Sequence, residues 1–150
     1  MLNFTRTAVL FATALALVLL IQDSAAAQQR LPNPVLAFIG QEQVEAGGKQ
    51  LIRYKYDVAN KAKYPNELFA PSPNLPPCGT NTKSARTWID VYDQRGRRLN
   101  GFCAITRSAD LDKLWFDLAP DMVPPSWVYI EMTDRETDTK YKSNLAETTP

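Results

Sequence analysis

The stretch SARTWIDVYDQRGRRLNGFCAI, from Ser84 to Ile105, decides the fold. Its first half alternates residue by residue: one side carries Thr87, Ile89 and Val91, and the other carries Trp88, Asp90 and Tyr92. Period-two alternation in a run of β-branched and aromatic residues indicates a β-strand. Asp93 to Gly96 then supplies turn chemistry, because glycine adopts positive φ without a Cβ clash. The stretch therefore predicts a β-hairpin whose second arm ends at Phe102 to Ala104.

The same alternation recurs on both sides of this hairpin. Further strands are predicted over residues 34–39, 51–58, 113–118, 127–132 and 139–142. Their core-facing side chains are expected to be Ile52, Tyr54, Tyr56, Val58, Leu114, Phe116, Leu118, Val128, Ile130 and Met132. Turn signals separate the strands about every ten residues, and no long helical period is present. The pattern predicts an all-β chain, a single antiparallel β-sandwich of about seven strands.

Two connecting segments are also informative. Residues 59–77 are rich in proline, which excludes an α-helix or a central strand, because proline lacks the N–H donor and restricts the residue before it. Leu68 and Phe69 within it are expected to anchor this segment to the core. Residues 108–112 predict a turn or a single helical turn, with Ser108 or Asp110 able to cap it.

The N-terminus reads as a cleavable secretory signal peptide over residues 1–27. Arg6 precedes an apolar run over residues 8–21, and Ala25 to Ala27 offers the small residues that a signal peptidase reads. The alternative is an uncleaved anchor, but the run is shorter than the roughly 20 residues that span a bilayer. We therefore expect a periplasmic or secreted protein with no stable membrane insertion after cleavage. A lead-in over 28–33, a sandwich domain over 34–144 and a flexible tail over 145–150 complete the predicted organisation.

Charge and composition exclude several function classes. The net charge is +1, and it stays +1 without residues 1–27, which contain one basic and one acidic residue. Such a balanced surface has no electrostatic footprint for nucleic acid. The chain contains no histidine, which removes histidine-based nucleophile systems and most transition-metal sites. We accordingly expect no enzyme, no catalytic residue, no cofactor and no metal site.

Cys78 and Cys103 are the two cysteines, and both lie in the exported part. An even count in an oxidising compartment favours a disulfide. The bond would close a loop of 26 residues, counting both ends, and stabilise the fold by roughly 3–4 kcal/mol in the chain-entropy model. Two free buried thiols are the alternative.

Leu118 to Asp121, followed by Pro125 to Ile130, resembles the corner before the penultimate strand of fibronectin type III domains. Ile52 to Val58 is similar to the second strand of such domains. The resemblance covers most of residues 34–144 and implies a fibronectin type III or immunoglobulin-like sandwich. The pattern Pro-Pro-Cys-Gly and Gly-Phe-Cys-Ala is similar to that of small exported bacterial proteins of unassigned role. Cys78 and Cys103 depart from the antibody arrangement, because they would join a loop to a strand.

Outward-facing aromatic side chains are the strongest candidate for a binding surface. If the β-branched positions face the core, the candidate residues Trp88, Tyr92, Trp127 and Tyr129 lie on the outer face, and so does Trp115. Exposed aromatic clusters often mark surfaces that bind protein or sugar. The alternative is that a loop covers them, or that one strand is shifted by a residue, which would turn each side chain to the opposite face.

Three charged groups are weaker candidates. Carboxylates at alternate positions from Asp134 to Asp138 are compatible with calcium, but a solvated turn fits them better. Two carboxylate pairs, Asp90 with Asp93 and Asp110 with Asp112, could serve acid–base chemistry, although no sequence feature indicates a cleft around them. The cations of Arg95 to Arg98 could contact an acidic partner or lipopolysaccharide, or simply form a solvated turn.

The function expected from these observations is an exported, non-enzymatic binding or accessory module. Its partner would be a protein or a cell-envelope component, reached through sheet edges or the outward aromatics. The alternative is a carbohydrate-binding module that stacks glycans on the same aromatics.

Overall fold

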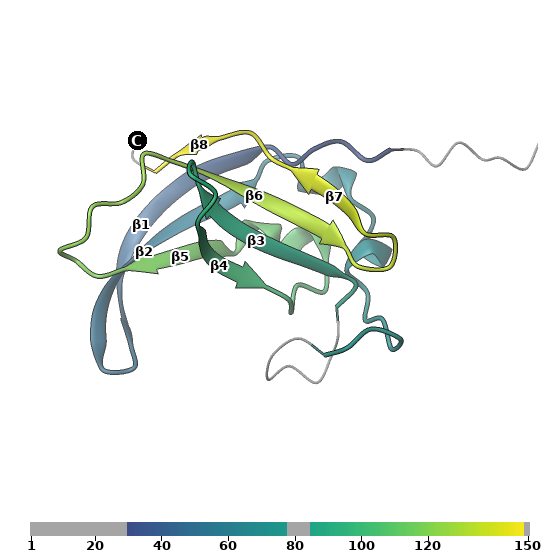
Figure 1. Ribbon diagram of the computed structural model, residues 1–150, viewed down its shortest axis with the longest axis horizontal. Helices are drawn as coiled ribbons and strands as arrows, with labels where there is room; N and C mark the ends of the chain where they lie inside the picture. The colour runs from purple at the N-terminus through teal and green to yellow at the C-terminus, as the bar shows by residue number, and fades with distance from the viewer. Residues whose placement is uncertain (1–29, 78–84, 149–150) are drawn as a thin grey trace, which may run out of the picture. The chain divides into compact units, whose positions relative to one another are not determined.

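Two antiparallel sheets form the architecture of the computed structural model, which describes residues 30–77 and 85–148 (Figure 1). One sheet has the strand order β1-β2-β5, and the other has the order β4-β3-β6-β7, with β8 also paired to β6. The strands are β1 Leu36–Ala46, β2 Lys49–Val58, β3 Thr87–Asp93, β4 Arg98–Phe102, β5 Leu114–Leu118, β6 Trp127–Asp134, β7 Thr139–Lys142 and β8 Ala146–Glu147. The predicted all-β sandwich is therefore present, with eight strands in the described residues.

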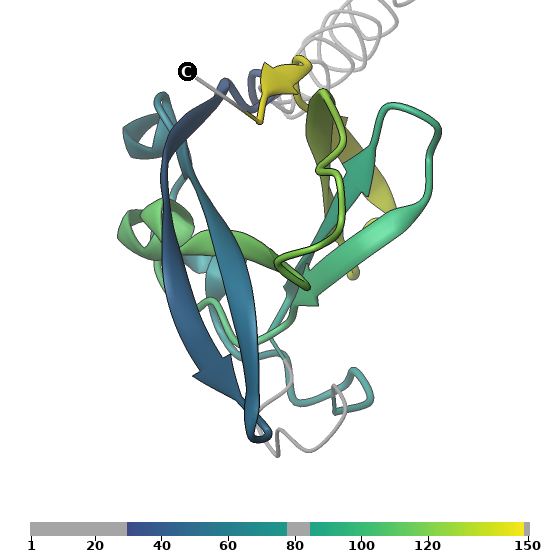
Figure 2. The same ribbon diagram turned by 90° about the vertical axis from the view of Figure 1, so that its left-hand side faces the viewer.

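The core fills the space between the two sheets, which face each other in Figure 2. Tyr54, Tyr56 and Val58 point inward from β2 as the alternation predicts, whereas Ile52 and Leu118, also predicted to face the core, are only partly buried and pack against it. Fully buried side chains from the other strands are Ile89, Val91, Phe116, Val128, Ile130 and Met132. Stacked rings of Tyr54 and Phe116, 5.0 Å apart, join β2 to its neighbour β5. The sheet faces thus lie as the periodicity predicts.

The central hairpin forms as its sequence indicates. β3 pairs antiparallel with β4, and Gly96 in the turn has a φ of 80°. β4 ends at Phe102, slightly before the predicted end of the arm. In the β1–β2 hairpin of the smaller sheet, β1 continues beyond the predicted strand over residues 34–39. The sequence did not predict this extension because the distal half of β1 is solvent-exposed and shows no alternation of apolar and polar residues. A register shift at Gly40, with a φ of 138°, bends this strand.

Three short 3-10 helices cover the end of the sandwich where β3 begins: η1 Lys61–Lys63, η2 Asn66–Phe69 and η3 Ser108–Asp112. Leu68 and Phe69 are buried, so the predicted anchor of the proline-rich segment is confirmed. The Thr87 hydroxyl donates to the carbonyl oxygen of Leu68 over 2.5 Å, which fixes this anchor to β3. The predicted cap of η3 is wrong: its N-terminal flanking residue is Arg107, without a side-chain capping bond.

The C-terminal residues are packed rather than loose, which corrects the expected flexible tail within the described range. Ala146 and Glu147 form β8, which pairs with Val128 and Trp127 of β6. Ala146 is buried and Thr148 is fully buried, and the Thr148 N–H donates to the carbonyl oxygen of Ser126 over 3.1 Å. Two residues are too few for an alternating pattern, so the sequence carries no signal for this strand.

The predicted signal peptide over residues 1–27 lies outside the described residues. Within residues 30–77 and 85–148, no helix has the length and apolarity needed to cross a membrane.

Candidate functional site

The outer face of the larger sheet carries all four predicted aromatic side chains. Trp88 and Trp127 are 36% and 40% exposed, and Tyr92 and Tyr129 are half-buried. They come from β3 and β6, which are paired along their whole length with Tyr92 directly opposite Tyr129. The two tyrosine rings stack with their centroids 5.3 Å apart. Because both strands are internal to the sheet, the backbone that presents these rings is held by hydrogen bonds on both sides.

A row of charges divides this face into two parts. Asp90 lies opposite Glu131, and like charges at such positions repel. Arg98 bonds Asp90 over 2.6 Å and Lys140 bonds Glu131 over 2.9 Å, so each carboxylate is balanced. Trp88 lies four residues from Tyr92 along β3, about 13 Å away. The candidate residues therefore form no single patch; Tyr92, Trp127 and Tyr129 gather at one end, here termed the aromatic end.

Cations cover several of the rings, a feature that the sequence does not reveal. The Arg135 guanidinium lies 4.2 Å from the ring centroid of Trp88, and the Lys142 ammonium lies 4.0 Å from that of Tyr129. Such cation–π contacts stabilise both groups. Trp127 has no ring or cation partner within the described chain. The pairing of β7 with β6 places Lys142 opposite Glu131, close to Tyr129. This strand pairing could not be predicted from the spacing of residues in the sequence.

Trp115, also predicted to point outward, lies half-buried on the smaller sheet. The Arg53 guanidinium lies 3.8 Å from its ring centroid and donates twice to Asp117, over 2.9 and 3.0 Å. A hollow of about 520 Å³ adjoins it, and Cys103 is among the residues that line it. Cys78 lies outside the described residues, so the Cys78–Cys103 disulfide stays a prediction.

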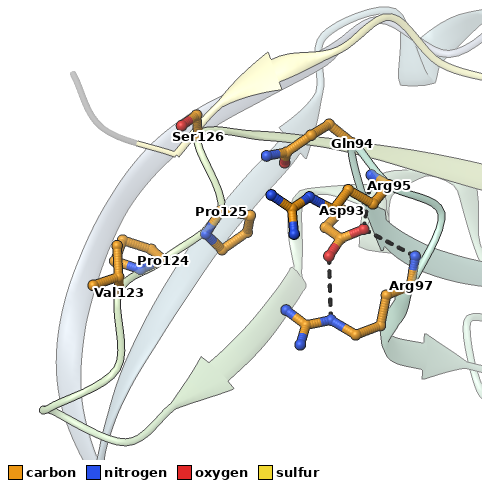
Figure 3. Close-up of a pocket in the computed structure, with 8 residues that line it drawn as sticks. All are labelled: Asp93, Gln94, Arg95, Arg97, Val123, Pro124, Pro125 and Ser126. Atoms are coloured by element: carbon orange, nitrogen blue, oxygen red, sulfur yellow. Dashed lines mark hydrogen bonds and ion pairs between the residues drawn. The ribbon is translucent and has the colours of Figure 1, made fainter.

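A cavity of about 340 Å³ adjoins the aromatic end (Figure 3). One wall is the β3–β4 turn, with Asp93, Gln94, Arg95 and Arg97, and the other is the loop Val123–Ser126; we term this cavity the turn pocket. Gln94 connects the pocket to Trp127: its N–H donates to the Trp127 carbonyl over 3.1 Å, and its side-chain oxygen accepts the Trp127 N–H over 3.4 Å. The pocket and the exposed tryptophan thus share one rigid support.

Asp93 organises the turn that forms this wall. One carboxylate oxygen accepts the backbone N–H groups of Arg95 and Arg97, both over 2.9 Å, and the other accepts Nε of Arg97 over 3.2 Å. These hydrogen bonds, above all the one from the Arg97 backbone, hold the pKa of Asp93 below its ordinary value. Asp93 therefore stays ionised at neutral pH and fixes the turn.

The other charged candidates are used within the fold. Asp134 accepts two bonds from Arg86, so the proposed calcium turn has its first carboxylate occupied. Asp90 and Asp93 do not meet, because Asp90 faces outward and Asp93 lies buried on the opposite side of β3. Asp110 accepts hydrogen bonds from Lys113 and Arg107. Both bonds lower the pKa of Asp110, and the bond from Lys113 has the larger effect. Among the residues the structure describes, no three or more Cys, Asp or Glu side chains group to hold a metal ion.

Comparisons with protein-family models, with curated proteins and with solved structures return no match for this chain.

Proposed function

We propose that the chain is an exported, non-enzymatic binding or accessory module that recognises a protein or another cell-envelope component. The observation that carries this proposal is the aromatic end. Trp127 is 40% exposed on an internal strand, beside the stacked pair Tyr92–Tyr129 and a cavity. Rigid, amphipathic rings of this kind are typical anchors of binding surfaces, because they bury large area at low entropic cost.

The fibronectin type III or immunoglobulin-like identity belongs to the same proposal. In immunoglobulin domains the first, second and fifth strands share one sheet, and the third, sixth and seventh share the other. The order β1-β2-β5 against β3-β6-β7 supports this kinship. The fourth strand departs from the constant-type immunoglobulin order, since β4 pairs with β3.

Export and the disulfide can be tested together. A non-reducing mass measurement on the protein recovered from its source cells should give the mass of residues 28–150 less two hydrogens. A mass that includes residues 1–27 would contradict signal cleavage, and a mass without the loss of two hydrogens would contradict the disulfide.

Binding through the aromatic end can be tested by site-specific photo-crosslinking in an envelope extract. A photoreactive residue at position 147, opposite Trp127 in the β6–β8 pairing, should capture one discrete partner. The capture should weaken when Trp127→Ala is added, and it should be absent when the probe replaces Glu42 on the smaller sheet. Identical products from positions 147 and 42, or capture that Trp127→Ala leaves unchanged, would contradict the proposal.

A carbohydrate-binding module is the second candidate function. It is favoured by the uncovered ring of Trp127, but Arg135 and Lys142 already lie over Trp88 and Tyr129, which leaves fewer ring faces for sugars. This candidate predicts that glycans quench tryptophan fluorescence in the wild type and in Trp88→Ala, and fail to do so in Trp127→Ala. No quenching at millimolar glycan would exclude it.

A further inference from the structure

The turn pocket combines charged donors with an apolar wall. Figure 3 shows the side chains of Arg95 and Arg97 extending from the turn on the two sides of the Asp93 carboxylate, with their guanidinium groups directed toward the 123–126 loop. Opposite them lie Val123, which is 89% exposed, and two prolines. Because prolines have no N–H to donate and Val123 and Ser126 are uncharged, the charged hydrogen-bond donors of the pocket come from the turn alone.

The β3–β4 turn has one more arginine than there are carboxylates paired with its arginines. Arg97 is paired with Asp93, and Arg98 is paired with Asp90 on the outer face of the sheet. Arg95 has no carboxylate partner among the residues described. The single negative charge of Asp93 is offset by its ion pair with Arg97, so no carboxylate of the turn is left to balance Arg95.

A second donor beside Arg95 is oriented by the backbone. The side-chain oxygen of Gln94 accepts the N–H of Trp127, which leaves the NH2 group of the same amide as its free donor. Gln94 also borders the cavity. An anionic group in the turn pocket would thus meet a planar guanidinium and an amide donor, and its apolar neighbours would meet Val123 and the prolines.

We propose that the turn pocket binds a carboxylate of an acidic peptide segment on a protein partner, with Arg95 as the guanidinium that pairs with it. This inference rests on the proposed function, whose partner it assigns to acidic protein segments. A guanidinium matches a carboxylate with two parallel hydrogen bonds, as Arg53 with Asp117 and Arg86 with Asp134 already show in this fold. The cavity volume lies in the range of small-ligand sites.

The charge balance favours a protein over an anionic membrane. Attraction to an acidic lipid surface takes clusters of about four to eight cations. Here the turn has one unbalanced arginine, and the whole chain has a net charge of +1. One bidentate pair inside a partly apolar cavity suits a single Asp or Glu side chain better than a headgroup layer.

The test uses residues 28–150 and a capped peptide that contains two glutamates beside a leucine, titrated to millimolar concentration and followed by amide NMR shifts. We expect the largest shifts at residues 94–97 and 123–126. Arg95→Gln should weaken binding about tenfold or more, since it removes a charged pair. Arg98→Gln is the matched control, because it removes a neighbouring cation that points to the sheet face, and it should leave the affinity unchanged within about twofold.

Several results would overturn the inference. These are a glutamine version of the peptide that binds as well, equal losses in Arg95→Gln and Arg98→Gln, or vesicles of phosphatidylglycerol that bind while the peptide does not. The crosslinking at position 147 separates this inference from the proposed function. If partner capture persists and depends on Trp127 while the peptide fails to bind, only the acidic ligand is wrong; if capture fails while the peptide binds, the proposed envelope partner is wrong.

Discussion

Two buried aspartates end neighbouring strands at opposite ends of the larger sheet, and their turns differ in charge balance. Asp134, at the end of β6, faces Arg86, which also lies 3.2 Å from Glu136. Two carboxylates thus share one guanidinium there. Asp93, at the end of β3, is the single carboxylate of a turn that also carries Arg95 and Arg97.

The surroundings of the two turns differ in the same sense. Arg135 follows Asp134, and its donors are bonded to the carbonyl oxygens of Ala85 and Pro76 while its guanidinium lies over Trp88. The turn at Asp134 is therefore closed by its own contacts. The turn at Asp93 borders a cavity, and Arg95 is unbalanced within the described chain. The same device, an aspartate that accepts backbone N–H groups, serves stability at one end and leaves a donor for a ligand at the other.

Removal of the Asp134 carboxylate should give the largest effect. Asp134→Ala leaves the Arg86 guanidinium without its bidentate partner and removes the bonds to Thr137 and the Glu136 N–H. We expect the free energy of unfolding to fall by about 2–4 kcal/mol. Urea denaturation measures this loss. Asp121→Ala, a change of an exposed aspartate in the loop before β6, should stay within about 0.5 kcal/mol, and an equal loss in both variants would contradict the account.

Acid should destabilise the protein through both turns. Arg86 and the other donors hold the pKa of Asp134 below its ordinary value of 3.8, and backbone N–H groups do the same for Asp93. A group whose folded pKa is lowered contributes stability above its unfolded pKa and loses it as pH falls toward the folded value. The urea midpoint should therefore fall from about pH 5 downward, and less steeply in Asp134→Asn. If the urea midpoint falls with pH as steeply in Asp134→Asn as in the wild type, Asp134 is not a source of the acid sensitivity.

Backbone conformation gives a smaller contrast between the turns. Gly96 has a φ of 80° in one turn, and Asp138 has a φ of 54° in the other. A Cβ at Gly96 would meet nothing closer than the Tyr129 hydroxyl at 3.9 Å, so the cost of Gly96→Ala is conformational, about 1 kcal/mol. Asp138→Gly should change stability by less than about 0.5 kcal/mol, because aspartate tolerates this conformation. Thermal unfolding of both variants checks the difference, and the reverse order would be inconsistent with the turn geometry.

The smallest effect is expected at the exit of the Asp93 turn. Arg98 pairs with Asp90 over 2.6 Å, but its side chain is 61% exposed. Surface pairs of this kind contribute about 0–1 kcal/mol, so Arg98→Gln should shift the urea midpoint only slightly. A loss as large as that of Asp134→Ala would mean that the outer charges hold the sheet together.

The contrast between the turns marks the limit of prediction from this sequence. Alternation predicted the strands through Ile89, Tyr56 and Ile130, because a half-buried strand must place apolar groups at every second position. Gly96 likewise predicted its turn. Both are local signals, and both succeeded, whereas the local capping signal at Ser108 and Asp110 failed because neither side chain caps η3.

The remaining features depend on segments far apart in the chain. β8 is held by pairing with β6, and its two residues carry no period. The contact between Arg135 and Trp88 joins a turn to a strand 47 positions earlier in the chain. The turn pocket needs Val123 to Ser126 beside Gln94, which only the folded sheet brings together. Sequence reasoning could place three cations at residues 95–98, but it could not tell which of them stays unbalanced.

The most direct test of the account compares Arg95→Gln with Arg86→Gln, in stability and in binding of the glutamate peptide. Arg95→Gln should leave the free energy of unfolding within about 0.5 kcal/mol of the wild-type value. The same change should lower the affinity for the peptide about tenfold. Arg86→Gln should cost about 2 kcal/mol or more, because Asp134 stays buried without its partner, and the folded fraction should bind the peptide normally. Equal losses of stability in the two variants, or binding that Arg95→Gln leaves unchanged, would contradict the distinction between the two turns.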